Sequence, residues 1–111
     1  MQPGFNLWIE MDGQVALSGW RVKLLKTIAA TGSINAAARE MDIPYHTTWQ
    51  KIHEMEERLG VKLLETRIGG VQGGGAQLSP AAKEYLEKMD AFYDALTPVV
   101  EKTFRRIFEE K

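Results

Sequence analysis

The chain of 111 residues contains no cysteine, which excludes disulfide bonds and thiolate metal sites. Its apolar runs are only a few residues long, so the sequence offers no segment that could span a bilayer. Residues 1–6 carry no basic stretch followed by an apolar core, and therefore do not resemble a secretion signal. We expect a cytoplasmic protein whose residues 1–111 form one domain that makes no membrane contact.

An excess of charge of one sign is lacking too, because the formal net charge is only −1. The charges are nevertheless spread unevenly along the chain. Residues 18–83 hold nine basic and six acidic residues, whereas the two flanks together hold five basic and nine acidic ones. This distribution is compatible with a central region that faces nucleic acid and an acidic tail that faces a protein partner.

Alternating apolar positions near the N-terminus predict a β-hairpin over residues 6–17. Asp12 and Gly13 lie between the two predicted strands, and this pair suits the positive φ angles of a tight hairpin turn. The apolar positions are Leu7, Ile9, Met11, Val15 and Leu17.

Three helices are predicted over residues 18–60 from caps and apolar periodicity. Ser18 can cap the first helix, which Gly32 ends, and Ser33 can cap a short second helix rich in alanine. Pro44 is well placed as the first residue of the third helix. The side chains expected to face the core are Trp20, Leu24, Leu25 and Ile28, followed by Trp49, Ile52 and Met55.

Two short helices joined by a tight turn indicate a helix-turn-helix, in which the small side chains of residues 36–38 allow close crossing. A plain three-helix bundle would show the same pattern. The next residues favour the first alternative, because residues 63–78 predict two short strands around a glycine-rich loop, the hairpin known as a wing. We therefore predict a mostly α-helical fold with small β-hairpins, a winged helix-turn-helix.

A long helix is predicted over residues 80–110, with Ser79 as its cap, Pro80 in its first turn and an interruption at Pro98. Its apolar stripe is longer than a head of this size would bury. The stripe therefore favours homodimerisation over packing on the chain's own head. The residues expected at the dimer interface are Tyr85, Met89, Phe92, Tyr93 and Leu96.

Three stretches together resemble one known family: residues 31–41, residues 43–45 with Trp49, and residues 69–79. They look like the N-terminal winged helix-turn-helix domain of ModE-type molybdate-responsive regulators. They are similar, more distantly, to the head of LysR-type regulators, which has close counterparts of residues 58–64. The similarity covers about residues 6–96. It implies a sequence-specific transcriptional regulator, not an enzyme, that binds double-stranded DNA as a homodimer.

The sequence departs from the ModE-type pattern in two ways. Regulators of that type continue into molybdate-binding domains, whereas this sequence ends before one could begin. We therefore expect no molybdate binding and no cofactor. In addition, Pro44 and His46 stand where the family often has a small hydroxyl residue and a lysine, which leaves the operator sequence open.

The outer side of the third helix is the predicted contact with DNA, because the first turns of such a helix enter the major groove. Gln50 could form paired hydrogen bonds with adenine, and Lys51 suits a phosphate. The glycine-rich wing would approach the minor groove or the phosphates, with Arg67 at its base and Gln72 at its tip. The predicted DNA-contacting residues are Ser33, Pro44, Tyr45, His46, Thr47, Gln50, Lys51, Arg67, Gly70, Gln72, Gly73 and Gly74.

Other functions fit these residues less well. The glycine-rich loop lacks the lysine and hydroxyl that follow the glycines of a nucleotide phosphate loop. His46 and His53 share a helix face but have no third convergent ligand, so we predict neither a metal site nor a catalytic site. The remaining alternative is a winged-helix module that binds protein and no DNA. The net negative charge favours it, as do Glu54, Glu56 and Glu57, which would repel phosphate.

Overall fold

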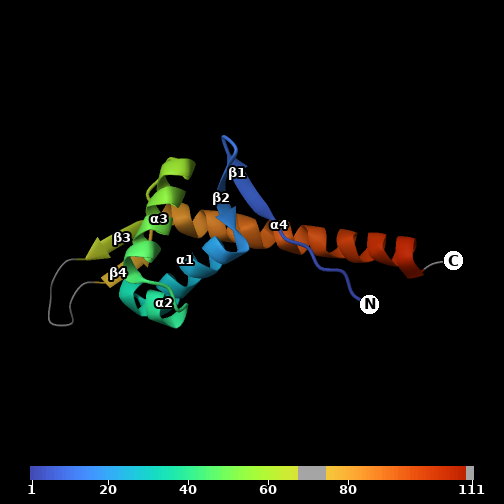
Figure 1. The fold of residues 1–111 in the computed structure, drawn as a ribbon. Coiled ribbons are helices and arrows are strands. Elements are labelled where there is room, and N and C mark those ends of the chain that lie inside the picture. Colours follow the sequence, from blue (N-terminus) through green and yellow to red (C-terminus); the bar gives the residue numbers. More distant parts are fainter. Residues whose placement is uncertain (68–74, 110–111) are drawn as a thin grey trace.

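The computed structural model describes residues 1–67 and 75–109 (Figure 1). The helices gather into a head from which the second half of the last helix projects, and the long dimension is 65 Å (Figure 1). The elements in chain order are β1 (Trp8–Met11), β2 (Gln14–Ser18), α1 (Gly19–Thr31), α2 (Ile34–Glu40), α3 (Tyr45–Leu59), β3 (Leu64–Arg67), β4 (Gly75–Leu78), α4 (Pro80–Phe104) and the π-helical turn η1 (Arg105–Glu109). The predicted fold class, mostly helical with two small antiparallel hairpins, is confirmed.

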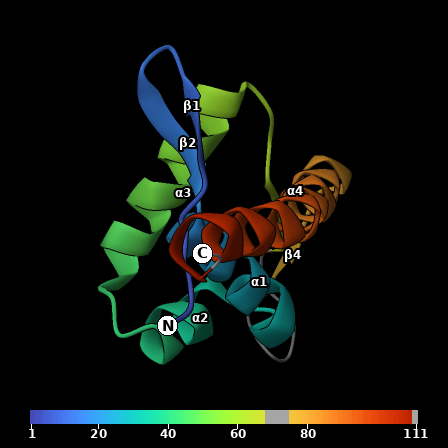
Figure 2. The same cartoon turned by 90° about the vertical axis from the view of Figure 1, so that its right-hand side faces the viewer.

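The first hairpin forms where the alternation predicted it. β1 and β2 pair antiparallel around Asp12 and Gly13, whose φ angles are 52° and 78°. Two successive positive φ angles are typical of the two-residue turn that matches the natural twist of a hairpin. Figure 2, which looks roughly along α4, shows this hairpin above that helix and beside α3, with α1 and α2 below.

The helix caps follow the predicted residues, with one correction. Ser18 Oγ and Ser33 Oγ each accept a backbone N–H in the first turn of α1 and α2, and Gly32 ends α1 at a φ of 71°. Pro44 was expected inside α3 but lies one residue before it, with an extended backbone. Its carbonyl accepts the N–H of Thr48 at 3.0 Å, so Pro44 occupies the cap position without a capping side chain.

The core lies where α1, α3, β2, β4 and the start of α4 meet. Two tryptophans expected in it are only partly covered: Trp20 is 40% exposed, and Trp49 packs against the edge of the core. The first turn of α1 instead turns Arg21 towards α3, where the guanidinium finds polar partners. The largest fully buried side chains are Leu17, Leu24, Leu25, Ile28, Ile52, Met55, Leu63 and Thr48.

The last helix corrects two predictions. α4 passes through Pro98 without interruption. Pro98 is exposed, so water can reach the carbonyl that loses its donor, and Thr97 Oγ1 donates to the Tyr93 carbonyl at 2.8 Å. Met89, predicted at a dimer interface, is instead part of the core and only 3% exposed. Within residues 1–67 and 75–109, no helix is both long and apolar enough to cross a membrane.

The N-terminal residues run beside α4 (Figure 1). The Leu7 N–H donates to the Tyr93 hydroxyl at 2.9 Å, and the rings of Phe5 and Tyr93 lie 5.4 Å apart. Further out, residues 1–3 and Phe104 line a hollow of about 410 Å³. Tyr93, another predicted dimer residue, is thus already engaged by its own chain.

Candidate nucleic-acid interface

The turn between α2 and α3 fixes the direction in which α3 leaves the head. Ala37 and Ala38 are buried, so α2 approaches α3 closely, as the small side chains predicted. The Ile43 N–H donates to the Ala38 carbonyl at 2.9 Å, which closes the turn. Thr48 is fully buried at the crossing, and its hydroxyl donates to the Pro44 carbonyl at 3.0 Å. The first turns of α3 are therefore held firmly against α2.

The outward face of α3 begins at its N-terminal end. Tyr45 is 50% exposed, and His46 and Gln50 are exposed beside it, whereas Thr47 is half-buried. Pro44 is exposed just before the helix. The structure therefore brings these predicted contacts together on one end of one helix.

Three rings form a column along one side of α3. Tyr45 meets Trp49 edge to face, with centroids 6.5 Å apart and an interplanar angle of 84°. Trp49 in turn stacks on His53, with centroids 5.3 Å apart and an angle of 21°. We call Tyr45, Trp49 and His53 the aromatic column. It explains why Trp49 is only partly buried, since one side of its ring serves the column and the other packs on the core.

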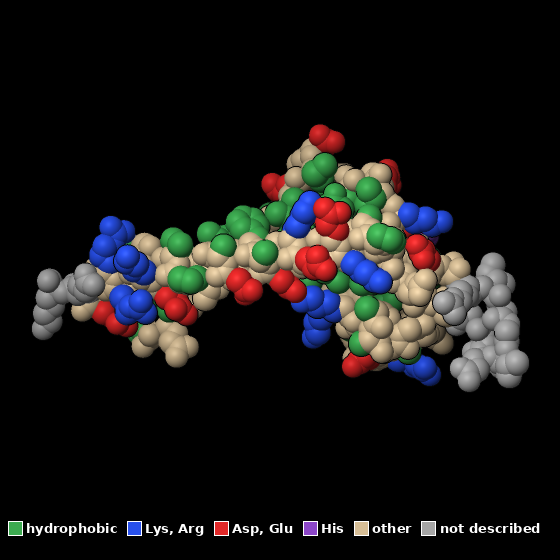
Figure 3. Space-filling view, turned by 180° about the vertical axis from the view of Figure 1, so that it is seen from behind, with side chains coloured by type: hydrophobic (Ala, Val, Ile, Leu, Met, Phe, Trp, Pro, Cys, Tyr) green, Lys and Arg blue, Asp and Glu red, His purple; other side chains and the backbone are tan. Residues whose placement is uncertain are grey.

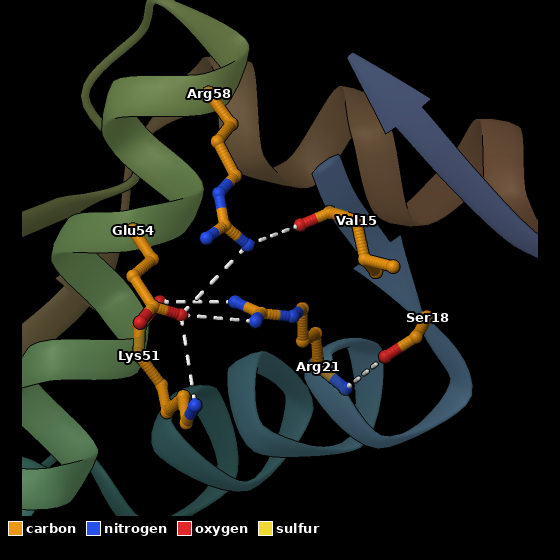
Figure 4. Close-up of polar contacts among 6 residues, drawn as sticks. All are labelled: Val15, Ser18, Arg21, Lys51, Glu54 and Arg58. Carbon is orange, nitrogen blue, oxygen red and sulfur yellow. Dashed lines mark hydrogen bonds and ion pairs between the residues drawn. The ribbon is translucent and has the colours of Figure 1, made fainter. Parts of the chain in front are cut away.

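The other flank of α3 carries a cluster of charges that faces α1 and β2 (Figure 4). Glu54 Oε2 lies 3.0 Å from Arg21 Nη2, 3.7 Å from Lys51 Nζ and 3.9 Å from Arg58 Nη1. Arg58 also donates to the Val15 carbonyl at 2.7 Å, and Arg21 donates to the Lys51 carbonyl at 3.4 Å. Lys51, expected to point outward, is therefore half-buried and paired within its own chain.

This cluster sets the charge state of Glu54. The hydrogen bond from Arg21 lowers the pKa of the Glu54 carboxyl, and the charges of Lys51, Arg21 and Arg58 lower it further, against the opposing effect of burial. Glu54 is thus a carboxylate surrounded by cations. The predicted repulsion of phosphate by Glu54 stays a prediction, but these three cations offset its negative charge.

Glu56 is also withdrawn from the outward face. Its Oε2 accepts the Leu63 N–H at 2.8 Å, and its Oε1 lies 3.4 Å from Nδ1 of His53. Of the three glutamates in this part of α3, only Glu57 is fully exposed. The outward face of α3 is thus less acidic than its sequence suggested.

The wing is anchored to the head by its returning strand. β3 and β4 pair antiparallel, and the Ala76 N–H donates to the Gly32 carbonyl at 2.9 Å, next to the cap residue Ser33. Arg67 is the last residue of β3 and pairs in register with Gly75. The predicted wing contacts Gly70, Gln72, Gly73 and Gly74 lie outside the described residues.

Arg21 is a structural residue of the candidate interface that the sequence did not indicate. It lies 33 positions from Glu54, and nothing near it in the sequence marks it as different from a surface arginine. Only the tertiary crossing of α1 and α3 brings the two together. Among the residues that the structure describes, no three histidine or carboxylate side chains gather where they could hold a metal ion.

Residues 21–83 match a family model described as the bacterial regulatory helix-turn-helix protein, lysR family. The chain belongs to this family. The matched segment runs from α1 through the wing to the first turn of α4, and so contains every element of the candidate interface.

Two relatives show which known proteins this lysR-family chain resembles. It is 42% identical over 82 residues to the molybdenum-pterin-binding protein MopB of Rhodobacter capsulatus, which covers 74% of the chain and 29% of the relative. It is 33% identical over 104 residues to the DNA-binding transcriptional dual regulator ModE of Escherichia coli K12, which covers 94% of the chain and 38% of the relative. The resemblance to ModE-type regulators is confirmed. The chain spans about a third of the length of these relatives.

Solved structures support the fold. The chain is similar to the CbnR_DBD–DNA complex with a TM-score of 0.56 and 21% identity, over 78% of this chain and 93% of that one. It is also similar to the BenM_DBD/benA site 1 DNA complex with a TM-score of 0.55 and 19% identity, over 80% and 94% of the two chains. These similarities confirm the predicted winged helix-turn-helix.

Proposed function

We propose that this lysR-family chain binds double-stranded DNA sequence-specifically and regulates transcription, with the N-terminal half of α3 in the major groove. The observation that carries the proposal is the outward face of α3. There Tyr45, His46 and Gln50 are exposed, whereas Glu54 is neutralised by cations. A helix end of this kind fits the major groove, where each base pair presents a distinct pattern of donors and acceptors.

The roles follow from residue chemistry. Gln50 carries a donor and an acceptor that can pair with adenine, and Tyr45, His46 and Thr47 suit base edges or phosphates. Pro44 and Ser33 lie at the starts of α3 and α2, where backbone atoms would approach the phosphates in the proposed complex. In the wing, Arg67, Gln72 and the glycines would follow the minor groove or the backbone. The match to MopB and ModE covers about a third of those proteins.

We also propose that the DNA-binding form is a homodimer joined through α4. Figure 3 shows hydrophobic side chains along the projecting part of this helix. Phe92 is 43% exposed, Val99 is exposed one turn beyond half-buried Leu96, and the three are spaced as one helical stripe. Tyr85 is half-buried and packs against the core, and Met89 belongs to the core. Two copies would present two α3 helices to half-sites about one turn of DNA apart.

DNA binding is tested by selecting fragments from a random duplex library and titrating the best one by fluorescence anisotropy. We expect the affinity to fall steeply as salt rises, because phosphate contacts release counterions. Gln50→Ala should cost about 1–3 kcal/mol at one base position and relax sequence preference there. No binding to any fragment would reject the proposal and favour a module that binds protein.

The dimer is tested by sedimentation of the full chain at tens of micromolar. We expect twice the chain mass for the wild type and the single-chain mass for Phe92→Glu, because the new charge would be buried against the partner. Ala91→Glu adds the same charge to the neighbouring exposed position and should leave the dimer intact. A wild-type monomer, or equal dissociation of both variants, would contradict the proposed interface.

A further inference from the structure

The aromatic column contains one residue that the proposed function leaves without a role, His53. The side chain of His53 is 67% exposed, yet two neighbours hold it. Its ring stacks on Trp49 at 5.3 Å, and its Nδ1 lies 3.4 Å from Glu56 Oε1. Ordering an exposed side chain costs rotamer entropy. The two contacts therefore indicate that His53 is fixed by its surroundings and restrains them in return.

The base of the column is tied to the backbone of the head. One carboxylate oxygen of Glu56 lies 3.4 Å from His53 Nδ1, and the other accepts the Leu63 N–H at 2.8 Å, next to the start of β3. Leu63 itself is fully buried. Glu56 therefore cannot shift without breaking a hydrogen bond to the core. The carboxylate beside the imidazole of His53 is thus fixed in place.

The other end of the column is the exposed ring of Tyr45. The rings of Tyr45 and Trp49 meet edge to face, a geometry favoured because the positive edge of one ring faces the negative π surface of the other. The orientation of the indole therefore restricts the rotamers open to Tyr45. Trp49 is itself packed on one side against the core and on another against His53. The position of His53 beside Glu56 thus restricts the ring of Trp49, which in turn restricts the ring of Tyr45.

We propose that His53 is a positioning residue for DNA recognition, which stacks on Trp49 and so fixes Tyr45 at the DNA-facing end of α3. This inference rests on the proposed function, because it requires Tyr45 to lie at the DNA. His53 itself stays away from the groove, since eight residues of helix place it about 12 Å further along the axis than Tyr45. His53 therefore acts through the two rings before it.

A double-mutant cycle on the full chain tests this proposal, using the selected DNA duplex and fluorescence anisotropy. We expect His53→Ala to weaken binding about three- to tenfold, the equivalent of one aromatic pair. Tyr45→Ala should weaken binding as well. Adding His53→Ala to Tyr45→Ala should cause no further loss, because His53 acts only through Tyr45. His53→Phe is the matched control: it keeps the ring stacked on Trp49 but loses the nitrogen beside Glu56, and should restore part of the affinity.

Two further measurements separate positioning from direct contact and from misfolding. The salt dependence of binding should be the same for His53→Ala and the wild type, because no phosphate contact is lost. In a Trp8→Phe/Trp20→Phe background, the emission of Trp49 reports on the stack. It should change with His53→Ala more than with His53→Phe, while the thermal midpoints stay close.

Three results would overturn the proposal. Additive losses in the cycle, with a reduced salt slope and no rescue by phenylalanine, would show that His53 contacts DNA directly. Unchanged affinity in His53→Ala would show that Tyr45 needs no support. A wild-type chain that bound no duplex would remove the proposed function itself, and this outcome differs from the other two because it concerns the unmodified protein.

Discussion

The two sides of α3 differ in how far the chain satisfies its own polar groups. On the flank towards α1, Glu54 is surrounded by three cations, and Arg21 and Arg58 also donate to backbone carbonyls. On the outward side, His46 and Gln50 form no side-chain hydrogen bond within the described residues. One side of the helix is thus committed to the fold and the other is available to a partner. The difference separates residues that should control stability from residues that should control binding.

The sharpest contrast is between Ile52 and Gln50, two positions apart. Ile52 is fully buried, so Ile52→Ala should lower the free energy of unfolding by about 2–5 kcal/mol through lost burial and the resulting cavity. Gln50→Ala should change it by less than about 0.5 kcal/mol. Urea unfolding followed by circular dichroism measures both. Similar losses for the two variants would mean that the helix is rotated relative to the structure described here.

A smaller effect is expected from the charged flank. Arg21→Met keeps much of the apolar stem but removes the charged hydrogen bond to Glu54, so it should cost about 1.5–3 kcal/mol. Lys26→Met breaks the ion pair with Asp90, in which both side chains are about half exposed, and should cost at most about 1 kcal/mol. Equal unfolding midpoints for the two variants would mean that the pair of Arg21 and Glu54 stabilises the fold no more than an exposed ion pair does.

The same flank should also make stability depend on acid. Because the folded chain lowers the pKa of Glu54, this carboxylate stabilises the fold above the unfolded value, about 4.3 for glutamate. The contribution is lost as the pH falls through the lowered pKa of the folded chain. Glu54→Gln should therefore be less stable than the wild type at neutral pH, with a difference that shrinks below about pH 4. Denaturant midpoints measured across this range would contradict the assignment if the difference stayed constant.

Substitutions of Gln50 and Lys51 should have the smallest effects on stability. Their effects on DNA binding should nevertheless differ clearly. Lys51 faces Glu54, so Lys51→Ala should weaken all DNA sequences about equally and only slightly. Gln50→Ala should instead alter the preference at one base position. A competition titration against duplexes with single substitutions distinguishes the two patterns. A sequence-specific loss in Lys51→Ala would mean that its side chain leaves Glu54 when DNA is bound.

The success of the sequence predictions followed the range of the interactions involved. Ser18, Ser33 and the Asp12–Gly13 turn were predictable because a cap or a tight turn depends on residues a few positions apart. The pairing of Arg21 with Glu54 was not, because it depends on the crossing of two helices. The predicted interruption of the last helix at Pro98 was wrong for a different reason. The local rule against proline assumes that the lost hydrogen bond has no substitute, whereas an exposed helix face has water.

The predicted site residues divide in the same way. Tyr45, His46 and Gln50 could be placed on the outer face from helical periodicity alone. Lys51 could not be placed, since its position borders the core side and its orientation depends on the charge of Glu54. Met89 follows the apolar period of α4 correctly, but periodicity cannot tell whether a stripe meets the chain's own core or a second copy.

The hydrogen bond from the Ala76 N–H to the Gly32 carbonyl has a mechanical consequence. It joins the returning strand of the wing to the turn that begins α2, while Glu65 and Thr66 of the outgoing strand remain exposed. The returning strand is therefore tied to the head at the start of α2, and the outgoing strand is tied at Leu63, whose N–H is accepted by Glu56. In the proposed complex, a force that DNA exerts on β4 would therefore reach the start of α2, the helix that packs against α3.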